Sequence, residues 1–219
     1  MVVRFVVTGF GRFSGVASNP TEWLVDNLPE YTRGRQSGPN ICAVLRVAAS
    51  DVDKWLEATG ERIKELYPED VVVWLHLGVD PGGKCLAIEQ QAINCATFIN
   101  PDEDGCTFIN RSIDESNGLS TDAHLCTDID VKSLLDELQQ RGFMATCSED
   151  AGRFVCNWIY FKSLRQAMMA GNGKWHSLFI HVPYFSRVPE KVQMEFVSTV
   201  MDSIAEQLAS RCDVSEVAA

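Results

Sequence analysis

The chain has 219 residues and a formal net charge of −11, and 46% of its residues are hydrophobic. A chain of this length can bury roughly 70% of its unfolded surface around one core, so we expect a single domain over residues 1–219. The negative charge argues against nucleic acid or an anionic membrane as the main partner. No apolar run reaches the roughly 18 residues of a membrane span.

The eight cysteines are scattered along the chain without a C-x-x-C pair. The first residues, Met1 to Arg4, lead directly into a strand pattern and show no signal peptide. Cysteines in such a chain are expected to be reduced thiols, not a disulfide framework. The sequence therefore predicts a cytoplasmic location.

Short apolar runs predict the strands of one sheet. Several of them are apolar throughout, which is typical of strands covered on both faces. Strands that alternate with helices predict an α/β fold with a mostly parallel central sheet. The expected strands are Val2–Val7, Ile41–Ala48, Val71–Gly78 at the sheet centre, Cys85–Asn94, Phe143–Cys147 and Ser177–Val182.

Capping residues and helical periodicity predict helices between these strands. Asn19 and Pro20 fit the N-cap and first position of one helix, after a glycine-rich loop over residues 8–15. Asp51 and Asp130 are expected to cap two further helices. Pro189 is expected to open the last one. The expected inward stripes run from Val52 through Trp55 to Leu66, from Val131 to Leu138, and from Val192 to Leu208.

The segment Asn100–Thr127 is polar, rich in turn residues and without periodicity. A segment of that length is usually a functional loop or a mobile one.

The stretch Ser148–Tyr160 joins a predicted strand to a predicted helix, in which Phe154, Trp158 and Phe161 share one stripe. Cys156 falls in the first turns of that helix, near unpaired backbone N–H groups and the positive end of the helix dipole. Such a position lowers the pKa of a thiol and supplies donors for an oxyanion. A lone cysteine is also often a small buried hydrophobe, so the residues alone leave both interpretations open.

Four ordered segments resemble the pyroglutamyl peptidase I family, cysteine peptidases that remove an N-terminal pyroglutamate. Ser148–Tyr160 is similar to the family's nucleophile segment, Ala87–Asn94 to its glutamate segment and Phe179–Pro183 to its histidine segment. Val7–Phe13, followed by Asn19-Pro20, resembles its opening signature. The resemblance covers nearly the whole chain and implies an α/β/α sandwich of the phosphorylase/hydrolase-like type. The Glu89-Gln90-Gln91 run is most similar to plant and protist members.

The resemblance implies a catalytic triad of Cys156, His181 and Glu89. Cys156 would be the nucleophile, His181 the base that later acts as an acid, and Glu89 the group that orients the imidazole. Glu89 lies in an otherwise apolar strand, where burial of a carboxylate needs a partner. A plain salt bridge would also satisfy that need.

His181 is the best of the four histidines as a base, because it ends an apolar strand at the sheet edge where active sites of α/β folds gather. His76 is the chief rival, but its apolar surroundings look like core. His124 and His176 lie among polar residues and are expected to be solvated.

Pyroglutamate is a neutral five-membered lactam, so its site needs an apolar slot with hydrogen bonds to the ring N–H and C=O. The resemblance implies that Phe10, Phe13, Phe154 and Val155 line this slot, although core packing would also explain apolar residues. Two segments depart from many bacterial members. The turn Gly78–Gly83 lacks their glutamine, and Phe98–Asp102 lacks their arginine.

Two other functions remain open at this stage. Gly9, Gly11 and Gly15 follow the first strand and could cradle a phosphate, which would make the chain a nucleotide-binding module. The chain could also be a non-catalytic relative that binds N-terminally blocked peptides. No H-E-x-x-H pattern is present, so we do not expect a metallopeptidase. The predicted thiol chemistry requires neither a metal nor a cofactor. The expected partners are N-terminally pyroglutamylated peptides, and a homo-oligomer is left open.

Overall fold

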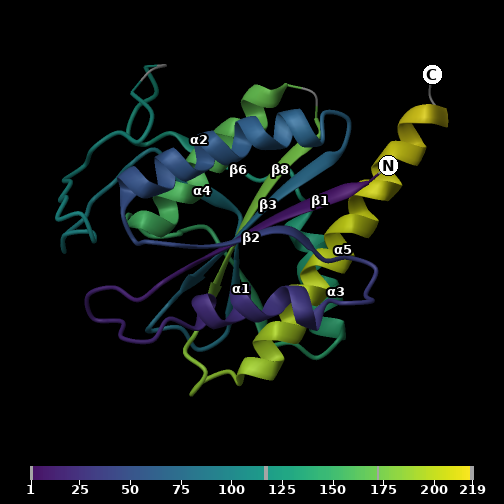
Figure 1. The fold of residues 1–219 in the computed structure, drawn as a ribbon, viewed down its shortest axis with the longest axis horizontal. Coiled ribbons are helices and arrows are strands. Elements are labelled where there is room, and N and C mark those ends of the chain that lie inside the picture. The colour runs from purple at the N-terminus through teal and green to yellow at the C-terminus, as the bar shows by residue number, and fades with distance from the viewer. Residues whose placement is uncertain (1, 116–117, 172, 218–219) are drawn as a thin grey trace.

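The computed structural model describes residues 2–115, 118–171 and 173–217, and it contains a central six-stranded sheet with helices on both faces (Figure 1). The strands of this sheet are β1 (Val3–Phe10), β2 (Pro39–Leu45), β3 (Val71–Val79), β4 (Leu86–Glu89), β7 (Ala145–Ser148) and β8 (Trp175–Val182).

The strand order is β2-β1-β3-β8-β4-β7. β2, β1, β3 and β8 are parallel, and β4 pairs antiparallel with β8 and parallel with β7. The expected α/β fold with a mostly parallel sheet is therefore confirmed. β3 is buried at every residue and lies beside β8 at the sheet centre, as the sequence predicted.

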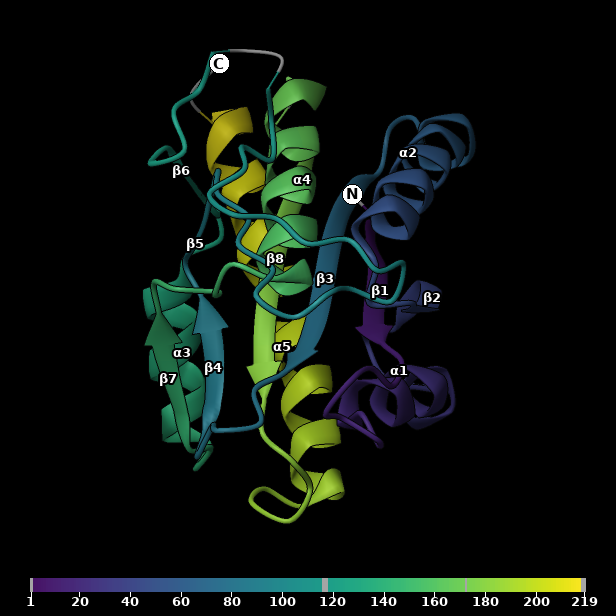
Figure 2. The ribbon, with the colours of Figure 1, turned by 90° about the vertical axis from the view of Figure 1, so that its left-hand side faces the viewer.

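Two helical layers cover the sheet (Figures 1 and 2). One face packs against α1 (Pro20–Tyr31), α3 (Val131–Gln140) and α5 (Glu190–Val217), and the other against α2 (Ala49–Leu66) and α4 (Val155–Ala170). Each face has its own apolar cluster, because most strand residues are buried on both sides. Within the residues that the structure describes, no helix combines the length and apolar character needed to cross a membrane.

β1 extends further than the sequence predicted, since Thr8, Gly9 and Phe10 continue the strand. A Cβ atom on Gly9 would lie only 2.5 Å from the backbone oxygen of Thr21. Glycine at this position therefore lets α1 approach β1 closely. The extension brings Phe10 to the end of the sheet where the candidate site lies.

The expected cap of α2 is wrong. The helix begins at Ala49, and the residue before it makes no side-chain capping bond. Instead, the carboxylate of Asp102 accepts a 3.0 Å hydrogen bond from the Ala49 N–H, while Asp51 pairs with Arg46 at 2.7 Å. A residue 53 positions away in the chain thus satisfies a free N–H of the first turn, which local sequence could not reveal.

The expected burial of the residues at two ends of the helix stripes is also wrong. Leu66 and Val192 are exposed, because they lie in the last turn of α2 and the first turn of α5. Nearer the middle of the α2 stripe, Val52, Leu56 and Ile63 are buried, whereas Trp55 is half-buried.

The single strand expected over Cys85–Asn94 is wrong, because the chain leaves the main sheet at Gln90. β5 (Gln91–Ile93) pairs antiparallel with β6 (His124–Cys126) in a separate two-stranded sheet. Asn157 of α4 holds β5 in this position. Its side chain accepts a hydrogen bond from the Ile93 N–H and donates one to the Ile93 carbonyl, both at 2.9 Å.

The segment expected to be irregular over Asn100–Thr127 contains β6 and is otherwise largely without regular structure. Residues 116 and 117 within it lie outside the described residues. Figure 2 shows this segment crossing the α4 side of the sheet.

Candidate active site

Cys156 is the second residue of α4, as the sequence predicted. The chain reaches this helix through a tight turn in which Gly152 has a φ of 80°, a conformation that favours glycine. The carboxylate of Asp150 accepts from the Gly152 N–H at 3.1 Å and holds the turn. The first turn of a helix leaves N–H groups without intrahelical acceptors, so Cys156 lies among donors that could bind an oxyanion.

The sulfur of Cys156 lies against the carboxyl end of β3. A Cβ atom on Gly78 would lie 3.0 Å from this sulfur and 2.6 Å from the ring of Phe179. No side chain fits there without displacing one of them. This role of Gly78 could not be predicted from the sequence, in which the turn after Gly78 differs from that of many bacterial relatives.

His181 and Glu89 meet across the antiparallel pair of β8 and β4. Ala87 is the direct partner of His181 and Glu89 is the partner of Phe179, so the two side chains are diagonal neighbours on one face. The His181 Nδ1 and Glu89 Oε1 atoms are 2.7 Å apart, and the two side chains are 12% and 2% exposed.

Burial acts to lower the pKa of His181, but hydrogen bonds to Cys156 and Glu89 outweigh it and raise that pKa to about 10. Because Nδ1 faces Glu89, the Nε2 atom is the one left to face the sulfur. The structure thus brings Cys156, His181 and Glu89 together in that order.

Two backbone contacts fix Glu89. The Tyr160 hydroxyl donates to the Glu89 carbonyl at 2.8 Å, and the next N–H, of Gln90, donates to the Ser148 carbonyl at 2.7 Å. Burial raises the pKa of Tyr160 well above its usual value, so this hydroxyl stays a neutral donor. Tyr160 lies in the segment that carried the family resemblance, but sequence alone gave it no role.

The other histidines lie elsewhere. His76 is fully buried in the core, as expected, and burial lowers its pKa to about 3. Its Nδ1 atom lies 2.8 Å from the Thr8 hydroxyl. His124 is exposed, as expected. The expectation for His176 is wrong: β8 begins before it, so the side chain is buried and bonds Asp128 at 2.8 Å.

A small slot lies beside the sulfur. All four residues expected there line it, together with Cys156. Phe10 and Val155 are also part of the core, so packing and slot lining are compatible. Three further lining residues, Asn19, Val47 and Val79, were not predicted from the sequence. The slot residues are Phe10, Phe13, Asn19, Val47, Val79, Phe154, Val155 and Cys156.

Asn19 is the one polar side chain of that slot besides the thiol. Its amide donates to the Gly11 carbonyl at 3.0 Å and its Oδ1 accepts from the Thr21 N–H at 3.1 Å. The expected role of Asn19 as the N-cap of α1 is confirmed. Its second place, in the lining of the slot, could have been found in the sequence only through the Asn19-Pro20 pair of the opening signature.

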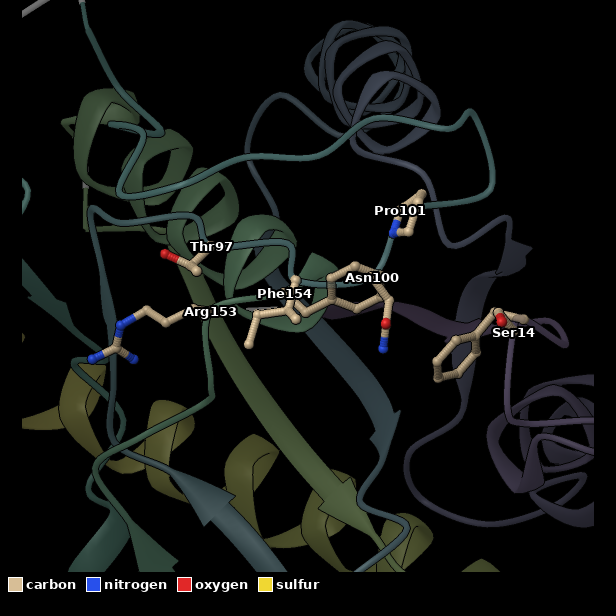
Figure 3. A pocket seen from close by; sticks show the side chains of 8 residues that line it. Ser14, Thr97, Asn100, Pro101, Arg153 and Phe154 are labelled. Carbon is tan, nitrogen blue, oxygen red and sulfur yellow. The ribbon is translucent and has the colours of Figure 1, made fainter.

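A larger cavity of about 440 Å³ adjoins the slot, and Phe13 and Phe154 line both (Figure 3). Their ring centroids are 6.2 Å apart. Among the described residues, no group of three His, Cys, Asp or Glu side chains could hold a metal ion.

Comparisons with known proteins identify the family of this chain. The family model described as pyroglutamyl peptidase matches residues 3–214. The pyrrolidone-carboxylate peptidase of Pyrococcus furiosus is 32% identical over 190 residues, which cover 87% of this chain and 84% of the relative. That of Pseudomonas fluorescens is 30% identical over 187 residues, with 85% and 80% covered.

Solved structures give the same result. A crystal structure of the Pyrococcus furiosus pyrrolidone carboxyl peptidase superimposes with a TM-score of 0.81 and 27% identity, covering 94% of this chain and 99% of the other. That of Fervidobacterium islandicum gives a TM-score of 0.75 and 26% identity with the same coverage. With a family model that spans nearly the whole chain, this protein belongs to the pyroglutamyl peptidase family.

Proposed function

We propose that this protein is a cysteine exopeptidase that hydrolyses the bond after an N-terminal pyroglutamate. The observation that carries the proposal is the line of contacts from the Cys156 thiol through the His181 ring to the buried Glu89 carboxylate. This is the order that nucleophilic catalysis needs: a nucleophile, a base within hydrogen-bond reach, and a group that orients the base. Membership of the family supports the same reaction.

The proposed reaction has two steps. In the first, the proton of the Cys156 thiol passes to Nε2 of His181, the sulfur attacks the pyroglutamyl carbonyl carbon, and N–H groups at the start of α4 stabilise the oxyanion. His181 then donates its proton to the leaving amine, and a thioester remains. In the second, His181 takes a proton from water, which attacks the thioester and releases pyroglutamate.

Glu89 has a fixed role in this scheme. Its Oε1 atom holds Nδ1 of His181, so that Nε2 points to the sulfur and the imidazolium is stabilised. The pKa of His181, raised to about 10, means that the ring carries a proton at neutral pH, ready for the leaving amine.

The lining of the slot beside the sulfur suits a flat neutral ring, and the slot, with a volume of about 20 Å³, has to widen to admit one. Phe10, Phe13 and Phe154 supply apolar surface, and the Asn19 amide lies among the few polar groups that could meet the lactam. We propose that pyroglutamate binds there with its carbonyl carbon at Cys156.

The nucleotide-binding alternative is weakened by the backbone of the glycine-rich segment. A phosphate cradle needs free N–H groups. Gly11 instead donates to the Leu45 carbonyl, Phe13 and Val16 bond each other, and Ser14 donates to the Glu103 carboxylate. Retention of the complete thiol, imidazole and carboxylate set argues against a non-catalytic binding protein.

A fluorogenic pyroglutamyl amide tests the proposal directly. The purified protein should release the fluorophore, and Cys156→Ala should not. Comparable release by the variant would contradict the role of Cys156. No release by either protein would contradict the proposed activity. The cytoplasmic location and the lack of nucleic-acid or membrane partners stay predictions from the sequence.

A further inference from the structure

The 440 Å³ cavity next to the slot has the size of a ligand site and no role in the scheme above. It shares Phe13 and Phe154 with the slot, but Cys156 lines only the slot. In Figure 3, Thr97 and Arg153 lie on one side of Phe154, and Asn100 and Ser14 lie toward the other.

Ile99 is the most unusual residue of this cavity. It lines the wall, yet its side chain is 88% exposed. A large apolar side chain on the rim of a cavity gains contacts when a ligand covers it. Ile109 is nearly as exposed, at 83%, and lies in the same long segment, but it does not line the cavity.

The wall that carries Ile99 is held at both ends. On one side, the Thr97 N–H donates to the Arg153 carbonyl at 2.9 Å, and the buried ring of Phe98 packs 4.7 Å from that of Phe154. On the other side, the carboxylate of Asp102 accepts from the Ala49 and Cys106 N–H groups at 3.0 and 2.9 Å. The cavity is therefore formed before any ligand binds.

We propose that this cavity is the subsite for the residue that follows pyroglutamate, and that Ile99 makes it selective for apolar side chains. The inference depends on the function proposed above. Pyroglutamate is the first residue of its peptide, so a cavity beside its slot holds either the second residue or the ring itself. The ring must place its carbonyl carbon at Cys156, which lines the smaller slot.

Charge does not favour an acidic residue in this subsite. Arg153 lines the cavity, but it pairs with Asp150 at 2.6 Å. That neighbouring carboxylate offsets the positive charge, and Phe13, Ile99 and Phe154 leave much of the lining apolar. The subsite should therefore prefer leucine over glycine.

The test compares pyroglutamyl-leucine amide with pyroglutamyl-glycine amide by their kcat/KM values. Full burial of a leucine side chain is equivalent to about 10- to 150-fold in affinity, and an open cavity should give the lower end, about tenfold. Ile99→Ser should reduce this leucine-to-glycine ratio several-fold. The matched control, Ile109→Ser, should leave the ratio at its wild-type value.

Each outcome separates the two proposals. Equal kcat/KM values for both amides in the wild-type protein would overturn the subsite and leave the peptidase activity intact. An equal loss on both amides in Ile99→Ser would assign the cavity to the pyroglutamyl ring, which also overturns it. Hydrolysis of neither amide would overturn the proposed function and the subsite together. Since Ile99 is exposed, its substitution should not change the melting temperature.

Discussion

The Nδ1 atom of His181 and the Oε1 atom of Glu89 lie 2.7 Å apart, although 92 residues separate them in the chain. The contact exists because β4 runs antiparallel to β8 in an otherwise mostly parallel sheet. In this register Glu89 pairs with Phe179 and Ala87 pairs with His181, so Glu89 and His181 are diagonal neighbours on one face. A buried carboxylate with a single strong partner is costly to disturb, so this pair should control both activity and stability.

Removal of His181 should be nearly as damaging as removal of Cys156, because the two act as one unit. We expect His181→Ala to lower kcat by about 10²–10⁴-fold or more. Glu89→Gln should lower kcat less, since an amide can still hold the ring. Steady-state assays on a pyroglutamyl amide check both. His76→Ala serves as the comparison, and a larger loss of kcat there than in His181→Ala would mean that the wrong histidine was assigned.

The Cys156 thiol should react with iodoacetamide before the other thiols. The reason is its place in the first turn of α4, where the His181 ring lies within hydrogen-bond reach of the sulfur and can take its proton during attack. Desolvation, by contrast, raises the pKa of Cys42 to about 12 and so keeps that thiol unreactive. Mass spectrometry of partly alkylated protein gives the order of labelling. Full activity after complete alkylation of Cys156 would end the assignment.

The position of Cys156 could be predicted because its signals are local. The apolar run of β7, the turn residues after it and the aromatic stripe of α4 are contiguous in the sequence, and each indicated the same strand-to-helix junction. The expected slot residues Phe10, Phe13, Phe154 and Val155, by contrast, came from the family resemblance and not from local signals.

Contacts between distant segments could not be predicted in this way. Asp102 accepts from the N–H of Ala49 at the start of α2, 53 residues away in the chain. Asn157 accepts from the N–H of Ile93 in β5, 64 residues away. Neither contact changes the local periodicity, so the start of α2 and the break at Gln90 were both missed. His176 was missed because polar neighbours in sequence concealed the start of a buried strand.

Gly78→Ala should lower kcat about 10²-fold, the loss expected when a reacting group moves by about 1 Å. The added methyl group would lie 3.0 Å from the Cys156 sulfur and 2.6 Å from the Phe179 ring. Gly82→Ala is the matched control, since its nearest neighbour would be the Asp80 carboxylate at 3.6 Å. Circular dichroism shows whether both variants fold. Wild-type kcat in folded Gly78→Ala would show that the added methyl group does not displace the Cys156 sulfur.

The contribution of His181 to stability should depend on pH in a defined window. Its folded-state pKa, raised to about 10, exceeds the ordinary value of 6.5. The stabilisation is therefore fully present below pH 6.5 and is lost as the pH rises through 10. Urea unfolding at pH 7 and 10 should show a smaller difference in the free energy of unfolding between wild type and His181→Gln at the higher pH.

His76 provides the opposite case for that experiment. Burial lowers its pKa to about 3, so its ring is neutral in the folded and unfolded states above pH 7. The effect of His76→Phe on stability should therefore stay constant between pH 7 and 10. A His181→Gln difference that is equally constant would show that the ring is not held as an imidazolium.

The last prediction concerns the discrimination between pyroglutamyl and prolyl amides, whose rings are nearly isosteric. Proline lacks the ring carbonyl and carries a charged amine, so it would leave lactam-binding groups unpaired and bring a charge against Phe10 and Phe13. A site that hydrogen-bonds a substrate group rejects an analogue lacking that group by about 10⁴-fold or more, whereas an apolar slot alone discriminates by about 10- to 200-fold. We therefore expect kcat/KM values at pH 7–8 to differ by about 10⁴-fold. Phe13→Ala should weaken binding of the pyroglutamyl amide by raising KM. Comparable rates for the two amides would indicate a general cysteine aminopeptidase, and a large ratio with unchanged KM in Phe13→Ala would remove Phe13 from the slot.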